Sequence, residues 1–152
     1  MSVSERLSEL GIELPAVAAP VAAYVPAVVH AGLVYTSGQL PFSGGALPAT
    51  GKVGAEVSAE DANAYARTCA LNALAAAADV AGGVDRIAGV LRVGGFVAST
   101  PDFTGQPGVI NGASLVLGEI FGDAGRHVRA AVGVPVLPLD SPVEVDVVFI
   151  LA

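Results

Sequence analysis

The sequence is poor in the residues that form disulfides and metal sites. Its 152 residues include one cysteine, two histidines and no tryptophan. Cys69 has no second cysteine to pair with, which excludes an internal disulfide and a multi-cysteine metal site. His30 and His127 are far apart in the chain, and neither has a second ligand at metal-binding spacing. We therefore predict no metal site and, because nothing requires an oxidising compartment, a cytoplasmic location.

Positive charge is also scarce. Seven Lys and Arg residues stand against 14 Asp and Glu, for a net charge of −7. A surface that repels phosphates argues against a nucleic-acid partner and against binding to anionic membranes. The sequence therefore predicts neither partner.

No segment has the pattern of a membrane span or a signal peptide. Residues 14–51 lack charged side chains, but prolines interrupt them, and the longest proline-free piece, 27–40, is shorter than the roughly 20 apolar residues that a spanning helix needs. Glu5, Arg6 and Glu9 occupy the positions where a signal peptide would have its basic cluster and apolar run. We expect neither feature.

Motifs for nucleotide binding and covalent catalysis are missing as well. The chain has no GxGxxG, P-loop or nucleophile-elbow pattern. Cys69 lies in an alanine-rich segment that is typical of a helix, where a buried structural thiol is expected. The sequence therefore predicts no cofactor.

The length and the 53% content of apolar residues indicate one domain with one core, residues 1–152. Ser2 and Glu5 have the spacing of a capping box, which predicts a short helical turn before Gly11. We interpret residues 1–15 as a turn appended to the domain and lying outside its core.

Hydrophobic periodicity, caps and glycines predict the remaining elements. Gly94-Gly95 indicates either a bulge or the close approach of another backbone. The expected segments are extended chain at 16–29, strands at 33–36, 52–54, 86–98, 127–134 and 143–151, and helices at 58–82 and 111–121. Two helices without regular βαβ units predict an α+β fold, with the helices on one face of a mixed, mainly antiparallel sheet.

Two charged residues stand out in apolar strands, Arg129 and Glu144. An arginine in such a strand can extend its head to water, pair with a carboxylate such as Glu144, or bind an anionic ligand. Beside them, the polar cluster 36–39 and Asn111 remain as candidate ligand-binding residues. The residues alone leave these alternatives open.

The chain resembles the reactive intermediate deaminase family, also called YjgF, from about Pro20 to Ala152. Five blocks carry the resemblance, in order: Tyr24-Val25; YTSGQLP at 35–41; ALNAL at 70–74; the block around Asn111; and RHVRAAVGVPVLPLDSPVEVDVVF at 126–149. The last is the most specific, because Arg129 and Glu144 lie 15 residues apart around Leu137-Pro138, as the family's arginine and glutamate do.

The resemblance implies a chorismate-mutase-like fold and a homotrimer with ligand clefts between subunits. It implies hydrolysis of small enamines and imines, such as 2-aminoacrylate, to a 2-keto acid and ammonia. Arg129 would bind the substrate carboxylate and Glu144 would polarise the attacking water. Tyr24 of the adjoining subunit would wall the cleft, with Gly38 and Asn111 as further contacts.

One family feature is missing. A cysteine lies two residues beyond the arginine in the family's best-studied branch, whereas this chain has Ala131, which offers its main chain only. One alternative is therefore a noncatalytic protein that binds small 2-keto acids in the same cleft. Another is the ribonuclease or translation-inhibitor role attached to the family's name, which the acidic composition disfavours.

Overall fold

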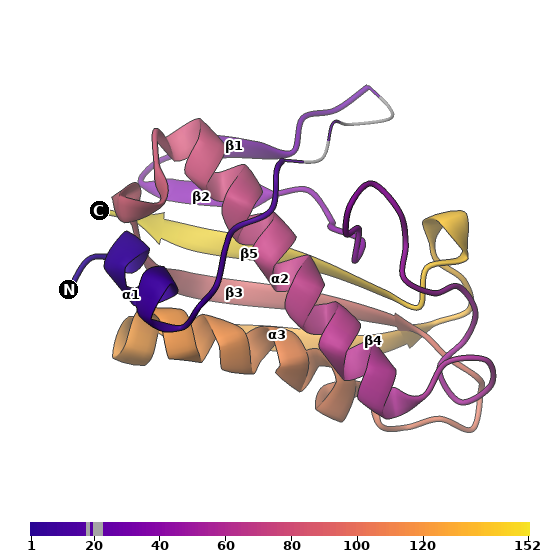
Figure 1. The fold of residues 1–152 in the computed structure, drawn as a ribbon. Coiled ribbons are helices and arrows are strands. Elements are labelled where there is room, and N and C mark those ends of the chain that lie inside the picture. Colours follow the sequence, from indigo (N-terminus) through magenta and orange to yellow (C-terminus); the bar gives the residue numbers. More distant parts are fainter. Residues whose placement is uncertain (18, 20–22) are drawn as a thin grey trace.

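The computed structural model describes residues 1–17, 19 and 23–152, and Figure 1 shows a mixed sheet with helices on one side. The sheet has five strands in the order β1-β2-β5-β3-β4. Only the β3–β4 pair is parallel; the other pairs are antiparallel. The strands are β1 Ala27–His30, β2 Leu33–Thr36, β3 Ile87–Ala98, β4 Val128–Val134 and β5 Val143–Leu151.

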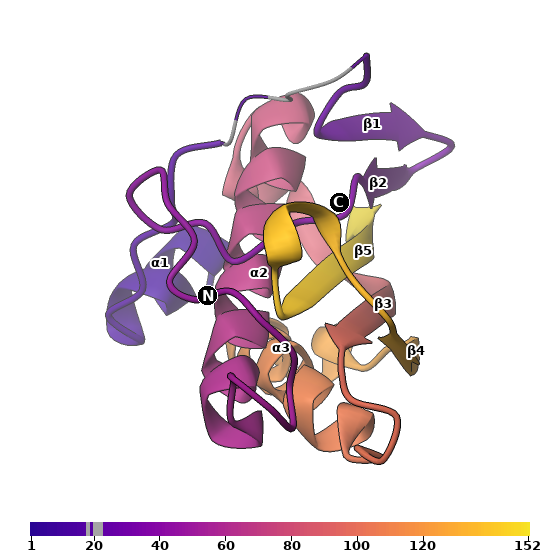
Figure 2. The ribbon, with the colours of Figure 1, turned by 90° about the vertical axis from the view of Figure 1, so that its right-hand side faces the viewer.

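Three α-helices cover one face of this sheet, as the two views together show (Figures 1 and 2). They are α1 Val3–Glu9, α2 Ala59–Ala81 and α3 Gln106–Phe121, and short 3₁₀ helices follow at η1 Val84–Arg86, η2 Gly122–Gly125 and η3 Pro138–Asp140. The predicted α+β class, with its two main helices on one face of a mixed sheet, is confirmed.

Helix α2 begins and ends at the residues that the sequence indicates. The Ser58 hydroxyl accepts from the Asp61 amide at 3.0 Å, and Gly82 ends the helix in the left-handed conformation with φ of 86°. Small residues on the inner side of α2, including Ala62, Ala66 and Cys69, are fully buried. They bring the helix backbone close to the sheet.

Helix α3 begins five residues earlier than the predicted Asn111. Pro107 occupies the first turn, where a missing amide hydrogen costs nothing. Where α3 crosses α2, a Cβ on Gly112 would lie 1.9 Å from the carbonyl oxygen of Asn63. The two helices therefore touch through backbone at this position.

The N-terminal turn is part of the core, in contrast to our expectation. The Ser2–Glu5 capping box forms as predicted. Leu7 is only 6% exposed and belongs to the main core cluster. Asp85 in η1 accepts bonds from both the amide and the hydroxyl of Ser4, each at 2.8 Å. A capping box predicts a helix but not the surface on which the helix packs. The sequence therefore did not predict that the N-terminal turn belongs to the core.

Three strand predictions also differ in detail. Residues 52–54 form no strand; Val53 alone makes two isolated bridges, to Val57 and to Ser99. The irregularities of β3 lie before Arg92, whereas Gly94 and Gly95 are sites of close approach, where a Cβ would strike Asp146 and Ile110 respectively. Within the predicted extended stretch 16–29, residues 18 and 20–22 lie outside the described part, and 27–30 forms β1.

The second face of the sheet carries no helix in Figure 2. Side chains alternate between the two faces along each strand. Those that point away from the buried β5 side chains therefore lie on this second face. Several of these are apolar and exposed: Val28, Tyr35, Val128 and Val132, with exposed fractions of 48%, 43%, 69% and 44%. We call this surface the open face.

Candidate functional site

The predicted site residues fall into two groups in one chain. Tyr24, Gly38 and Glu144 line one pocket, and we call them the acidic half-site. Arg129, Asn111 and Ala131 lie on α3 and β4, and we call them the basic half-site.

The acidic half-site is a pocket of about 340 Å³. Its other lining residues are mostly apolar: Ala19, Pro26, Gln39, Leu40, Phe42, Pro138 and Leu139. Gln39 exchanges both backbone hydrogen bonds with Val145, which holds Gly38 beside Glu144. The Ser37 hydroxyl donates to the Val25 carbonyl at 2.6 Å and so ties the Tyr24 segment to the same place.

Gly38 is required by the position of the Glu144 carboxylate. A Cβ on Gly38 would lie 2.7 Å from Oε1 and 2.8 Å from Cδ of Glu144. Any side chain there would displace the carboxylate. The absence of a side chain at residue 38 therefore shapes the acidic half-site.

Glu144 is a partly buried carboxylate with a raised pKa. Burial is the main cause, and the nearby negative charge of Asp146 adds to it. Asp146 itself pairs with Arg92 at 3.4 Å. Within the described residues, Glu144 makes no ion pair. A carboxylate with a raised pKa is a stronger base than a solvated one, as general-base chemistry requires.

Arg129 is partly buried, and neutral groups of α3 hold it. Its Nη1 donates to the Ser114 hydroxyl and its Nη2 donates to the Pro107 carbonyl, both at 3.1 Å. No carboxylate lies within ion-pair distance of Arg129 in the part of the chain that the structure describes. A guanidinium has five N–H donors, so three remain for a ligand.

Asn111 and Ala131 lie near Arg129 on the same two elements. Asn111 is exposed on α3, one turn from Pro107 and three residues from Ser114, and therefore on the same side of the helix. Ala131 shares the helix-covered side of β4 with Arg129, because it lies two residues along the strand.

A single chain does not bring Arg129 and Glu144 together. Glu144 lies opposite Phe96, on the open face. Arg129 lies opposite Val93, on the face that the helices cover. The two charges therefore do not neutralise each other within one chain, which answers one alternative that the sequence left open.

Tyr24 and Glu144 of the same chain line one pocket, whereas the resemblance assigns Tyr24 to the adjoining subunit. The structure adds Ser114, His127 and Pro107, which were not among the predicted site residues. Ser114 and His127 contact each other although they are 13 residues apart, and Pro107 contacts Arg129 from a first turn of α3 that the sequence did not predict.

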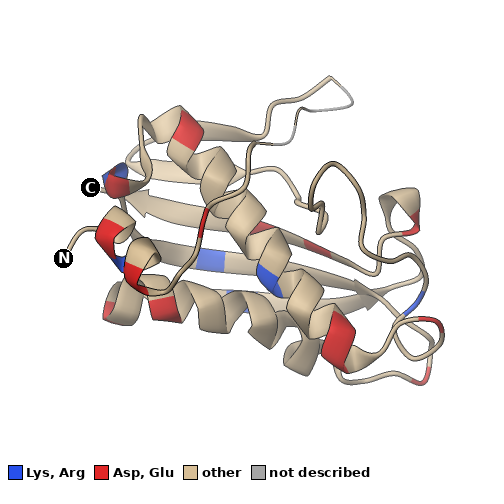
Figure 3. Ribbon diagram, viewed as in Figure 1, with Lys and Arg blue, Asp and Glu red and all other residues tan. Residues whose placement is uncertain are grey.

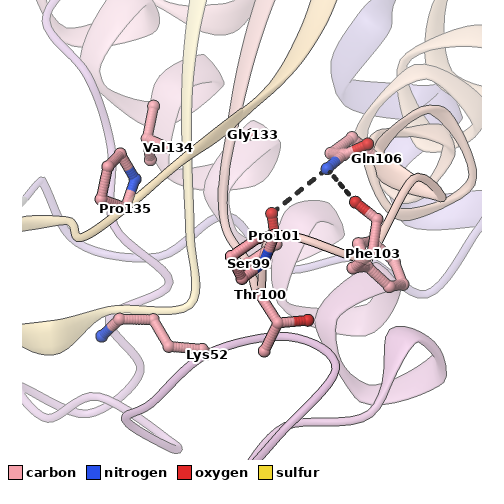
Figure 4. Close-up of a pocket in the computed structure, with 9 residues that line it drawn as sticks. All are labelled: Lys52, Ser99, Thr100, Pro101, Phe103, Gln106, Gly133, Val134 and Pro135. Atoms are coloured by element: carbon pink, nitrogen blue, oxygen red, sulfur yellow. Dashed lines mark hydrogen bonds between the residues drawn. The ribbon is translucent and has the colours of Figure 1, made fainter.

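Another cavity lies at the ends of β3 and β4 and the start of α3 (Figure 4). It measures about 680 Å³. Its Gln106 amide donates to the Ser99 hydroxyl at 3.2 Å and to the Phe103 carbonyl at 2.8 Å. Its one ionisable lining residue, Lys52, pairs with Asp140. This cavity therefore offers no unpaired ionisable side chain, whereas the acidic half-site offers Glu144.

Two further findings concern the described residues only. They contain no cluster of three or more His, Cys, Asp or Glu that could hold a metal ion. None of their helices is both long enough and apolar enough to cross a membrane.

The sheet order and the helices on one face define the chorismate-mutase-like α+β class. A family model described as "YjgF/chorismate mutase-like, putative endoribonuclease" matches residues 4–152, and the chain belongs to this family. The family prediction from the sequence is confirmed.

Individual relatives agree with this assignment. The chain is 43% identical over 147 residues to the protein TCP17 of Trypanosoma cruzi, covering 95% of this chain and 91% of that one. The structure of Atu1372 from Agrobacterium tumefaciens, a protein of unknown function, is 42% identical with a TM-score of 0.88, covering 99% and 92% of the two chains. A Shewanella oneidensis structure, described as "a putative endoribonuclease", is 35% identical with a TM-score of 0.94, covering 99% of this chain and 100% of that one.

Proposed function

We propose that this protein hydrolyses small enamines and imines of 2-keto acids, such as 2-aminoacrylate, in a cleft formed by two copies of the chain. The enamine first takes a proton on carbon and becomes an iminium. Water then adds to the iminium carbon, and the adduct releases ammonia to leave the 2-keto acid. No cofactor is needed, because a protonated imine is already electrophilic and requires only a positioned water and a base.

One observation carries the proposal: each half-site holds a charge that no described residue of its own chain neutralises. Arg129 is anchored by a hydroxyl and a carbonyl and keeps three donors free. Glu144 has a raised pKa and no ion-pair partner among the described residues. In the proposed roles, Arg129 binds the substrate carboxylate with two parallel hydrogen bonds and Glu144 takes a proton from the water.

The placement of these charges supports an assembly of several copies of the chain. Arg129 and Glu144 lie on opposite faces of one sheet, so one substrate can touch both only if they come from different copies. We propose the homotrimer that the family resemblance implies, with the acidic half-site of one subunit facing the basic half-site of the next. The exposed apolar side chains of the open face support contact between copies, because such surfaces gain stability when covered.

A noncatalytic 2-keto acid binder is the alternative. It would use the same arginine, and Ala131 in place of the family's cysteine motivates it. The two functions differ in what Glu144 does. If Glu144→Ala abolishes turnover while 2-ketobutyrate binding persists, the protein is an enzyme; if wild type binds the keto acid but turns over no imine, it is a binder.

The names of relatives suggest endoribonuclease activity, and the charge distribution argues against it. Lys and Arg are scattered over the ribbon and follow no single track in Figure 3. RNA binding depends on contacts to phosphates from clustered basic groups. RNA cleavage that survives stringent purification and disappears in Arg129→Ala would contradict the deaminase proposal.

The test of the proposed function is coupled turnover. A pyridoxal-phosphate-dependent dehydratase generates 2-aminoacrylate, and release of the keto acid above the uncatalysed rate is measured. Arg129→Ala is expected to lower kcat/KM about 30-fold or more, because it removes the charged partner of the carboxylate. Arg129→Lys should recover little, since an ammonium cannot make the two parallel hydrogen bonds.

The matched control is Arg67→Ala, which removes the same charge from an exposed position on α2. It should keep the wild-type rate. Equal rates for wild type and Arg129→Ala would refute the proposed function.

A further inference from the structure

The Arg129 guanidinium is one end of a hydrogen-bonded chain that crosses three elements. Its Nη1 lies 3.1 Å from Ser114 Oγ on α3. Ser114 Oγ lies 2.9 Å from Nε2 of His127, the residue before β4. Nδ1 of His127 lies 2.7 Å from the carbonyl oxygen of Gly125 in η2.

The direction of each bond follows from the groups involved. A carbonyl cannot donate, so Nδ1 of His127 carries a hydrogen and donates to Gly125. A guanidinium cannot accept, so the Ser114 oxygen accepts from Arg129. The hydroxyl hydrogen of Ser114 can then donate to Nε2 of His127 in the tautomer whose hydrogen is on Nδ1. All three bonds are satisfied by one arrangement of hydrogens.

The far end of this chain is fixed to the helix. Gly125 is buried, and a Cβ on it would lie 2.7 Å from the Leu117 carbonyl oxygen and 3.2 Å from Cα of Gly118. The backbone of η2 is therefore packed directly on α3, and the Gly125 carbonyl has little freedom. Through His127, this position determines where the Ser114 hydroxyl points.

A second anchor holds the other side of the guanidinium. Nη2 of Arg129 donates to the Pro107 carbonyl at 3.1 Å. Helix carbonyls point toward the C-terminus and side chains lean toward the N-terminus, so Pro107 and Ser114 converge on one place although they are two turns apart. Two anchors on the two Nη atoms define the plane of the guanidinium.

We propose that Ser114 and His127 are positioning residues that orient Arg129 for its carboxylate ligand. This inference rests on the proposed function. A carboxylate that binds through two parallel hydrogen bonds requires the guanidinium plane in one orientation. A guanidinium that is already oriented loses less freedom when the ligand binds, which strengthens binding. Neither residue touches the substrate in this scheme.

Kinetics separate positioning from a merely structural role. Weaker orientation of Arg129 weakens substrate and transition state alike, so KM rises while kcat changes little. Damage to the fold instead lowers the amount of active protein, so kcat falls and KM does not change. We expect Ser114→Ala to raise KM about tenfold, the scale of one hydrogen bond to a charged group. His127→Ala should shift KM in the same direction.

Two further variants complete this set. Ser114→Thr keeps the hydroxyl and should have a KM close to wild type. Ser8→Ala removes a serine hydroxyl from the exposed side of α1 and should change neither constant.

A second measurement does not depend on turnover. Nitrogen-15 NMR of the arginine side chains reports rotation of the Arg129 guanidinium, assigned by its loss in Arg129→Lys. We expect slow rotation in wild type and Ser114→Thr, and fast rotation in Ser114→Ala and His127→Ala. Equal rotation in all four proteins would overturn the inference, as would a Ser114→Ala variant that loses kcat with KM unchanged.

The turnover assay and the NMR measurement test the two proposals separately. If wild type shows no imine turnover, the proposed function fails. The rotation data then decide alone whether Ser114 and His127 orient Arg129.

Discussion

Glu144 combines a proposed chemical role with a cost to the fold. Its carboxylate lies beside Gly38, is partly buried, and has a pKa raised by burial and by Asp146. The folded chain therefore holds a proton on Glu144 more tightly than the unfolded chain does. Above the raised pKa, the ionised carboxylate reduces the free energy of unfolding.

Because the ionised carboxylate lowers the free energy of unfolding, Glu144→Gln should change the stability in a predictable direction. At neutral pH the amide removes the unfavourable charge, so the variant should unfold at a higher temperature than wild type while losing imine turnover. The gain should shrink as the pH falls through the raised pKa, and it should vanish below the ordinary value of 4.5, where both folded and unfolded carboxyl groups are protonated. Thermal unfolding monitored by circular dichroism across this pH range measures it.

Glu13→Gln, at an exposed carboxylate between α1 and β1, is the control and should unfold at the wild-type temperature at neutral pH. A Glu144→Gln variant less stable than wild type at neutral pH would contradict the assigned cause of the shift.

For individual residues, the sequence predicted which charged side chains lie in apolar strands. It did not predict which face of the sheet each of them occupies. The alternation of β4 separates Val128 and Val132 from Arg129 and Ala131, as expected. The valines are nevertheless on the exposed side, and Arg129 is on the side that the helices cover. Periodicity assigns residues to two faces; only the packing of α3 determines which face is covered.

At the scale of elements, the contact between α2 and α3 depends on Gly112. A Cβ there would overlap the Asn63 carbonyl at 1.9 Å, and backbone cannot move aside as a flexible side chain can. Gly118 is on the same helix, and nothing lies within 4 Å of the position of its Cβ. The two glycines therefore form a matched pair.

We predict opposite effects for alanine at these two positions. Gly112→Ala should lower the free energy of unfolding by about 1–3 kcal/mol, because it forces the helices apart. Gly118→Ala should raise it by roughly 0.5–1 kcal/mol, because alanine loses less backbone freedom in a helix. Urea unfolding of the two variants measures both. Equal effects of the same sign would contradict the described crossing.

The predictability of an element depended on how local its signals are. Helix α2 was predicted at both ends because Ser58 and Gly82 act on their own turns. Helix α3 was predicted to begin late because no side chain caps its first turn. The burial of Leu7 was missed because it depends on contacts with distant segments, which no local pattern contains.

At the scale of the whole molecule, the sheet separates the two halves of the proposed site. One side holds Arg129 between β4 and α3, and the other holds Glu144 beside Gly38. The resemblance pointed to both residues, and the fold places them on opposite faces of the sheet. The central claim is therefore that each site takes its arginine from one copy and its glutamate from another.

Mixing two inactive variants tests this claim most directly. Arg129→Ala and Glu144→Ala are prepared separately, mixed in equal amounts, unfolded and refolded together, and assayed for imine hydrolysis, with mass spectrometry to confirm mixed assemblies. Random assembly pairs an intact Arg129 with an intact Glu144 at about a quarter of the subunit boundaries of a cyclic oligomer. We predict recovery of about a quarter of the wild-type rate. Mixed assemblies as inactive as the two parents would show that both residues act from one chain, and would contradict the account.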